Sequence, residues 1–299
     1  GFPAYWQRTI AESSPDGFAL LPIDKQTDTS TWRALESFLE TESSYLGKGR
    51  DTRATHGYNR LKLATAWRVE NPALWGKYTA GQGKVAQDMR RLAIAGKLRG
   101  PLGVKTARAT TALPSQLRVD LNETYLLHGA SPAVMLSILS TGLNERFAGA
   151  GAGTAFGDGA YFAEDAGKSD QYVGQRGRLD DRYDKGDELH KRLYAHVPHE
   201  GNVGYLVVCR VVLGHSVRTQ NTGGRMTSMD GGFKIFPVGQ RELAPVPGVS
   251  PPVFHHSLVA ELGGAIVRYR EFVVFHSEFV YPEYIIAYQR FQNQRGPIA

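Results

Sequence analysis

Three residues near the middle of this sequence have side chains whose types and spacing could do chemistry together. Ser169 and Tyr172 lie three positions apart in DAGKSDQY, so they face the same way if a helix capped by Asp165 runs through them. Tyr161 precedes them in FGDGAYFA, where glycines leave bare backbone beside its ring. The pattern predicts a surface of one hydroxyl group and two aromatic rings, and it leaves open what that surface contacts.

His128 and Glu271 are further candidates, and each has a plainer interpretation. His128 ends the apolar run TYLLH and is followed by Gly129, whose missing side chain leaves the backbone N–H and C=O open to a planar ligand. Glu271 begins the apolar run EFVVF, where ionised groups are seldom placed without a purpose. Taken singly, His128 is better explained as a structural residue of a strand, and Glu271 as a surface residue at a strand end.

Two other features are weaker candidates. The glycine-rich stretch GAGAGTAFGDG contains neither the dinucleotide-binding G-x-G-x-x-G pattern nor a P-loop, so a flexible loop or a cover over a ligand are the interpretations left open. Glu278 and Glu283 flank the dipeptide Tyr281-Pro282, which predicts a turn. We therefore expect both of these carboxylates to be solvated.

The composition is ordinary for a globular chain and restricts the sites that it can form. Of 299 residues, 41% are hydrophobic and 21% charged, and no apolar run approaches the length of a membrane-spanning helix. The net charge of +6 would attract polyanions weakly, although a solvated basic surface is the plainer interpretation. The single cysteine, Cys209, lies in the strand-like run YLVVCRVVL, which predicts a buried, inert thiol. Without a second cysteine or HExxH-type spacing, we expect no metal site.

The elements that would position the candidate residues begin with a helix-rich first third. Residues 30–41 form an amphipathic helical pattern, for which Ser30 is the expected cap. Residues 62–69 alternate like a strand, and a second helix is expected to begin after them, with Asn71 as its cap and Pro72 in its first turn.

Residues 100–119 show no periodicity, and we expect them to be a loop. The hydrophobic pattern of the sequence changes after them. Short apolar runs then alternate with glycine-rich turns, and one helix is expected to end at Gly142. The strands expected in this part cover residues 124–130, 160–163, 205–213, 271–275 and 284–289. Many short strands with few helices between them predict an α+β fold with a mainly antiparallel sheet.

The pieces described above occur together and in one order. YLLHGASPAVMLSILSTGL, FGDGAYFAEDAGKSDQY, GYLVVCRVVLG, HSLVAELGG and YREFVVF resemble the catalytic domain of the poly(ADP-ribose) polymerases, the diphtheria-toxin-like ADP-ribosyltransferases. The resemblance covers about Tyr125 to Gln289 and extends upstream through AWRVENPALWGKY and GFPAYW. Residues 101–120 and 174–250 match least.

The resemblance implies an α+β ADP-ribosyltransferase fold with a split, mainly antiparallel sheet. Residues 1–299 would be a single catalytic domain, with a helix-rich entry segment and loop over residues 1–120 and an NAD-binding core over residues 121–292. NAD+ would be the co-substrate, and no metal would be required. The zinc-binding cysteine cluster of the tankyrase branch is missing from this chain.

The resemblance also assigns catalytic roles to three of the candidates. His128, Tyr161 and Glu271 match the family's His-Tyr-Glu set, in which His128 would hydrogen-bond the adenine-side ribose. Loss of nicotinamide develops positive charge on its ribose, and a carboxylate at Glu271 would stabilise that charge, as in glycoside hydrolysis. Phe272 and Phe275 replace tyrosines of many relatives, which removes hydroxyl groups but keeps the packing.

Five further residues would bind NAD+ by the same resemblance. Backbone groups of Gly129 would grip the nicotinamide amide, to which Ser169 would add a contact. Tyr172 would stack on the nicotinamide ring, with Tyr161 on the opposite side. Lys168 belongs to the same K-S-x-x-Y motif as Ser169 and Tyr172, and Arg146 would approach the adenosine.

The expected activity is transfer of ADP-ribose to a protein acceptor, which could be the chain itself. A glutamate at position 271 permits elongation to poly(ADP-ribose), and single transfer to a protein or a nucleic acid is the alternative. A non-catalytic reader of NAD+ or ADP-ribose, and hydrolysis of NAD+ by water, are further alternatives. Use of NAD+ and the lone cysteine favour an intracellular working site.

Overall fold

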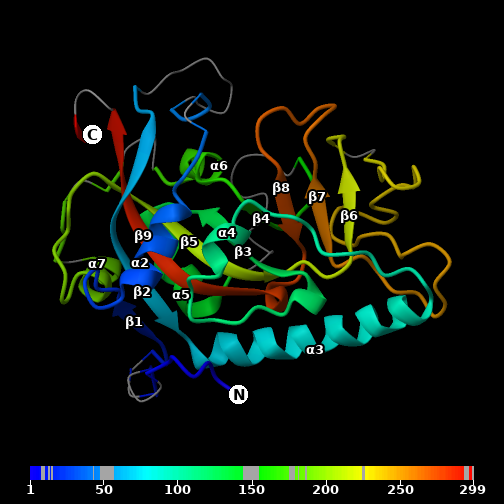
Figure 1. Cartoon of the computed structure of the whole chain (residues 1–299), viewed down its shortest axis with the longest axis horizontal. Helices are drawn as coiled ribbons and strands as arrows, with labels where there is room; N and C mark the ends of the chain where they lie inside the picture. The colour runs from blue at the N-terminus through cyan, green and yellow to red at the C-terminus, as the bar shows by residue number, and fades with distance from the viewer. Residues whose placement is uncertain are drawn as a thin grey trace.

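Ten strands of the described residues form one sheet in the computed structural model (Figure 1). The structure describes residues 1–7, 11–12, 14, 16–42, 44–47, 57–143, 155–174, 179–180, 182–185, 187–223, 226–292 and 296–297. The strand order is β1-β2-β9-β5-β3-β4-β8-β7-β6, with β10 added to β9. The strands are β1 (Ala19–Pro22), β2 (Arg60–Glu70), β3 (Glu123–Gly129), β4 (Ala160–Ala163), β5 (Val203–Val212), β6 (Ser216–Thr219), β7 (Ser257–Ala260), β8 (Glu271–Val274), β9 (Val280–Gln292) and β10 (Gly296–Pro297).

The sheet is mainly antiparallel, and it splits where its two halves meet. Only β6 and β7 pair in parallel among the described strands. β3 and β4 share a single pair, Leu127 with Ala163, whereas β3 pairs with β5 along its whole length. The half made of β4, β8, β7 and β6 can therefore diverge from the half that contains β3, which opens the sheet between them (Figure 1).

Helices cover both faces of the larger half of the sheet. They are α2 (Thr29–Ser37), α3 (Pro72–Ile94), α4 (Ala107–Thr110), α5 (Pro132–Thr141), α6 (Ala166–Ser169) and α7 (Glu188–Leu193), with short 3-10 turns η1 (Val119–Leu121), η3 (Asp170–Tyr172) and η4 (Ser277–Phe279). Val207 and Cys209 of β5 pack in one apolar cluster with side chains of α3, α5 and α7. Leu206 and Val208, which point to the opposite face, pack with α2 and α4. Burial on both faces explains why β5 is apolar at nearly every position.

Most of the expected elements are present, and several boundaries follow the expected caps. Asn71 caps α3 by accepting a hydrogen bond from the Leu74 N–H over 3.0 Å, and Gly142 ends α5. Ser30 was the wrong cap for α2, since that helix begins at Thr29 with Asp28 at the N-cap position. The Cys209 thiol is fully buried, and burial raises its pKa well above the ordinary value.

The expected solvation of Glu283 is wrong. Tyr281 and Pro282 continue β9 instead of forming a turn, and Glu283 is fully buried within that strand. Its carboxylate accepts hydrogen bonds from the hydroxyl groups of Tyr5 and Tyr125, which offset part of the cost of burial. Burial nevertheless raises the pKa of Glu283 above its ordinary value. Glu278 is half-buried and pairs with Lys84 at 3.0 Å.

Residues 1–120 contain both helices and strands. α2, α3 and α4 lie there, but β1 and β2 also lie there and extend the sheet beyond β9. The helix-rich entry segment and the single-domain boundaries thus remain predictions. None of the helices in the described part of the chain is long and apolar enough to cross a membrane.

Candidate active site

The candidate residues come together where the sheet splits. His128 lies near the end of β3, Tyr161 is the second residue of β4, and Glu271 is the first residue of β8. β3, β4 and β8 are neighbours in the sheet, although residues 128 and 271 lie far apart in the sequence. The short α6 and η3, which carry Lys168, Ser169 and Tyr172, follow β4 in the chain and contact β3.

Glu271 stands between two small residues on the neighbouring strands. It pairs with Ala163 of β4 on one side and with Ala260 of β7 on the other. Its carboxylate lies 3.0 Å from the Lys168 ammonium group, and the two side chains are 15% and 19% exposed. The flanking side chains are single methyl groups, and the Glu271 carboxylate is mostly buried against the Lys168 ammonium group.

His128 has one ring nitrogen committed to the protein and one available. Nδ1 lies 2.9 Å from the carbonyl oxygen of Tyr161, which can only accept, so Nδ1 carries the proton. Burial lowers the pKa of His128 below its ordinary value, which favours the neutral ring. Nε2 is then an acceptor without a partner among the described residues, and it can receive a hydrogen bond from a hydroxyl group.

Gly129 and Ser169 approach each other closely. A Cβ atom on Gly129 would lie 2.0 Å from the carbonyl oxygen of Ser169, so only glycine fits at position 129. The Ser169 hydroxyl group is buried and donates to the carbonyl oxygen of Leu127 over 3.2 Å. The polar groups of Ser169 and the backbone of Gly129 therefore lie side by side.

The segment that carries Ser169 and Tyr172 is helical, as expected, although it is not one continuous α-helix. Asp165 caps α6 by accepting from the Gly167 N–H over 2.9 Å, and the 3-10 turn η3 continues it to Tyr172. Residues three apart are aligned in a 3-10 turn, which keeps Ser169 and Tyr172 on one side. The Lys168 ammonium group lies 5.5 Å from the centre of the Tyr172 ring.

Asp170 anchors the α6–η3 segment to the sheet, and it was not among the residues predicted from the sequence. Its buried carboxylate accepts hydrogen bonds from the hydroxyl groups of Tyr58 and Tyr288, and from Arg290 Nε over 2.9 Å. Tyr288 and Arg290 belong to β9, so the ion pair ties η3 to the large half of the sheet. An acidic residue inside the K-S-x-x-Y motif was the available signal.

Tyr161 uses its hydroxyl group to hold the chain before β4. It donates to the Gly157 carbonyl oxygen over 2.8 Å and accepts from the Phe156 N–H over 2.9 Å. Burial raises the pKa of Tyr161 well above its ordinary value, and the nearby charge of Glu271 adds to the increase. The ring is half-buried and forms part of the site wall. Arg146 lies outside the described residues, so its expected contact with adenosine remains a prediction.

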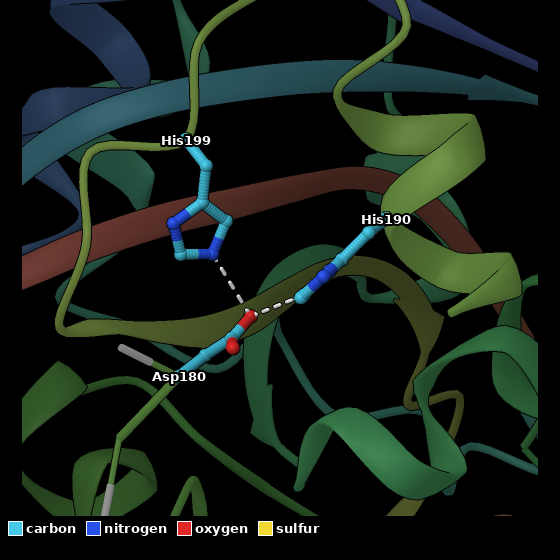
Figure 2. Close-up of side chains that lie close together, drawn as sticks. All are labelled: Asp180, His190 and His199. Carbon is cyan, nitrogen blue, oxygen red and sulfur yellow. Dashed lines mark hydrogen bonds and ion pairs between the residues drawn. The ribbon is translucent and has the colours of Figure 1, made fainter. Parts of the chain in front are cut away.

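A second polar cluster lies elsewhere, beside the start of β5. Asp180, His190 and His199 form the one group of described histidine and acidic side chains close enough to hold a cation (Figure 2). The His190 and His199 Nε2 atoms lie 2.6 Å and 3.1 Å from Asp180 Oδ2. The Tyr205 hydroxyl group donates to the same oxygen over 2.7 Å. Burial alone would raise the pKa of Asp180, but these three hydrogen bonds bring it below its ordinary value.

The backbone around this cluster determines which ring nitrogens carry protons. His190 Nδ1 accepts from the Asp184 N–H over 2.9 Å, and His199 Nδ1 accepts from the Gly201 N–H over 3.0 Å. In each neutral ring Nε2 must therefore carry the proton, which it donates to Asp180. A metal ligand needs a free lone pair at that nitrogen. The contacts fit a hydrogen-bonded network better than a cation site, and independence from metal remains a prediction.

A comparison with protein families agrees with the fold and covers the segments that form the candidate site. The family model described as "Poly(ADP-ribose) polymerase catalytic domain" matches residues 43–290, which is most of the chain. The match spans the strands β3, β4 and β8 and the segment α6–η3 that together form the site. The split α+β sheet is accordingly an ADP-ribosyltransferase fold. The chain belongs to the poly(ADP-ribose) polymerase catalytic domain family and is an NAD+-dependent ADP-ribosyltransferase.

Proposed function

We propose that this enzyme transfers ADP-ribose from NAD+ to a protein acceptor and that Glu271 permits the chain of ADP-ribose units to grow. The observation that carries the proposal is the position of Glu271. Its carboxylate begins β8, stands between two alanines and faces the Lys168 ammonium group at 3.0 Å. An ionised group held in this way can stabilise positive charge in a bound substrate.

Nicotinamide would bind between β4 and the α6–η3 segment. The Gly129 backbone and the Ser169 hydroxyl group lie together and supply donors and acceptors for its amide. The Tyr172 and Tyr161 rings would hold the flat ring from its two sides. Because the Ser169 hydroxyl group also has lone pairs, it can accept an amide N–H while it donates to Leu127.

The adenosine side of NAD+ would contact His128. Its Nε2 atom is an acceptor, so it can receive a hydrogen bond from a ribose hydroxyl group. Burial lowers the pKa of His128, which keeps the ring in this acceptor state at neutral pH. The contact with Tyr161 orients the ring before the substrate arrives.

Glu271 would act on the reacting ribose. As the bond between ribose C1′ and nicotinamide breaks, its electron pair leaves with nicotinamide and positive charge develops on the sugar. The carboxylate stabilises this charge and can hydrogen-bond the ribose 2′-hydroxyl group. An acceptor oxygen then attacks C1′ and loses its proton, a step that Glu271 can assist by polarising the acceptor. The Lys168 ammonium group, 3.0 Å away, holds the carboxylate in place.

Incubation with labelled NAD+, followed by electrophoresis, tests the proposal. We expect nicotinamide release and a ladder of labelled products on a protein, including the enzyme itself. A single labelled band would indicate one transfer, and a labelled nucleic acid would indicate an acceptor that the net charge of +6 could attract. Nicotinamide release without any labelled acceptor would indicate hydrolysis by water. NAD+ binding without nicotinamide release would indicate a reader and would contradict the proposal.

A further inference from the structure

Three charged residues lie side by side on neighbouring chain segments, at the register position next to Glu271. The β4–β8 ladder ends at the pair Ala163 and Glu271, and the β7–β8 ladder ends at Ala260 and Glu271. Along the same register, the next residues are Glu164 after β4, Arg270 before β8 and Glu261 after β7. Arg270 therefore stands between two glutamates at the point where the backbone ladders stop.

Arg270 makes its closest contacts with Glu164. Its Nε and Nη2 atoms lie 2.9 Å and 2.8 Å from the two carboxylate oxygens, so the pair is bidentate. The two side chains are only 16% and 6% exposed, which limits screening by solvent and salt. On the other side, Arg270 Nη1 lies 3.6 Å from Glu261, which in turn pairs with Arg218 at 3.0 Å.

The same two residues are anchored to the segment before β3. The Glu164 carboxylate also accepts from the Lys105 N–H over 2.7 Å, and Arg270 donates to the carbonyl oxygen of Gly103. Lys105 additionally pairs with Asp165 at 3.1 Å. The pair therefore belongs to a connected set of contacts, and neither side chain is a solvated surface group.

The neighbours of the pair in the sequence connect it to the site. Glu164 directly precedes Asp165, the cap of α6, which carries Lys168 and Ser169. Arg270 directly precedes Glu271, the first residue of β8. Adjacent strand residues point to opposite faces, so Arg270 can hold the strand from one face while Glu271 reaches the substrate on the other.

We propose that Glu164 and Arg270 are positioning residues for the transferase reaction. They hold the start of β8 against the start of α6, and so set the distance between Glu271 and the nicotinamide-binding segment. This inference rests on the function proposed above for Glu271. Backbone pairing ends at Glu271, so without the ion pair the two segments could separate. A misplacement of about 1 Å in an active site can cost on the order of 100-fold in rate.

The test compares Arg270→Gln with the matched variant Arg218→Gln, since both arginines pair with Glu261. For Arg270→Gln we expect kcat for nicotinamide release to fall by about tenfold or more, while KM for NAD+ changes by less than about threefold. Arg218→Gln should keep kcat within about twofold of the unaltered enzyme. Arg270→Lys, which retains the charge but not the two-pronged geometry, should recover part of the loss.

A double-mutant cycle separates the pair from independent structural effects. Glu164→Gln should lower kcat as Arg270→Gln does, and the double variant should lose little more than either single variant. Additive losses, or equal kcat values for Arg270→Gln and Arg218→Gln, would overturn the proposal. If Arg270→Gln does not fold, Arg270→Lys and Glu164→Gln provide the same comparison.

Amide hydrogen exchange provides a readout that does not depend on turnover. Exchange over residues 165–172 should accelerate in Arg270→Gln and stay unchanged in Arg218→Gln. If the unaltered chain releases no nicotinamide, the proposed function fails, yet exchange still shows whether the pair holds α6. Unchanged exchange in Arg270→Gln would contradict the positioning role in either case.

Discussion

The candidate active site and the Asp180 cluster contain the same kinds of side chain but use them differently. In the Asp180 cluster, both histidines and Tyr205 donate to one carboxylate oxygen, and both Nδ1 atoms accept backbone N–H groups. In the candidate site, His128 Nε2 has no hydrogen-bond partner among the described residues. Histidines and carboxylates alone therefore do not identify a site. The distinguishing feature is a polar group that is held in place and still has bonding capacity left.

This difference has a physical basis in the cost of leaving polar groups unsatisfied. A network in which every donor has an acceptor stabilises the fold and gains nothing from a ligand. A preorganised polar group without a partner lowers the stability of the free enzyme, and it gains its hydrogen bond or ion pair only when the substrate binds. Changes at the candidate site should therefore affect turnover, whereas changes in the Asp180 cluster should affect stability.

The largest effect on turnover is expected for Glu271→Gln. We expect kcat to fall by about 100-fold or more while NAD+ binding is retained, because a charge directed at the transition state is lost. The matched control is Glu278→Gln, which removes a carboxylate paired with a lysine at the same distance of 3.0 Å. Nicotinamide release measures both variants. Equal turnover in Glu271→Gln and the unaltered enzyme would refute the role of Glu271.

A smaller loss is expected for Gly129→Ala. The added Cβ would lie 2.0 Å from the Ser169 carbonyl oxygen, so the nicotinamide-binding segment must shift. We expect kcat/KM for NAD+ to fall by about tenfold or more. Gly83→Ala in α3 is the control, since a Cβ there meets no atom within 4 Å. Steady-state kinetics that do not differ between the two variants would show that the close approach is unimportant.

Asp180→Ala should leave turnover unchanged and lower stability. Three buried donors lose their acceptor, so the free energy of unfolding should fall by about 2 kcal/mol or more, as measured by urea unfolding. The control Glu188→Ala removes an exposed pair with Lys191 and should leave the free energy of unfolding nearly unchanged. EDTA should not alter the Tm of the unaltered enzyme. A drop in Tm with EDTA would show that a cation holds this cluster.

The smallest effect is expected from mild acidification. The folded-state pKa of His128 lies below its ordinary value of 6.5 because the ring is buried. Any loss of NAD+ affinity caused by protonation of the ring, as measured by calorimetry, should therefore titrate below 6.5. The contribution of the neutral His128 ring to the free energy of unfolding is fully present above the unfolded-state pKa. It is lost as pH falls through the folded-state pKa. A loss of affinity that titrates at 6.5 or above would contradict a neutral His128.

Local patterns in the sequence predicted much of the fold and most of the candidate residues. Caps and periodicity predicted α3, α5 and the helical turn after Asp165, because such signals act over a few residues. They failed at Glu283, where a Tyr-Pro dipeptide suggested a turn and the chain continued as a buried strand. β6 and β7 were not predicted from the pattern, although β4 and β8, which are equally short, were.

The sequence by itself determined which residues carry the family's motifs and in which order they occur. The tertiary structure decided which of these residues are in contact. Lys168 pairs with Glu271, and Arg270 pairs with Glu164. The hydrogen bond to the Tyr161 carbonyl oxygen determines the tautomer of His128. These contacts join segments that lie tens of residues or more apart in the chain. Their distances depend on strand register and on packing, which are properties of the whole sheet and cannot be derived from local spacing.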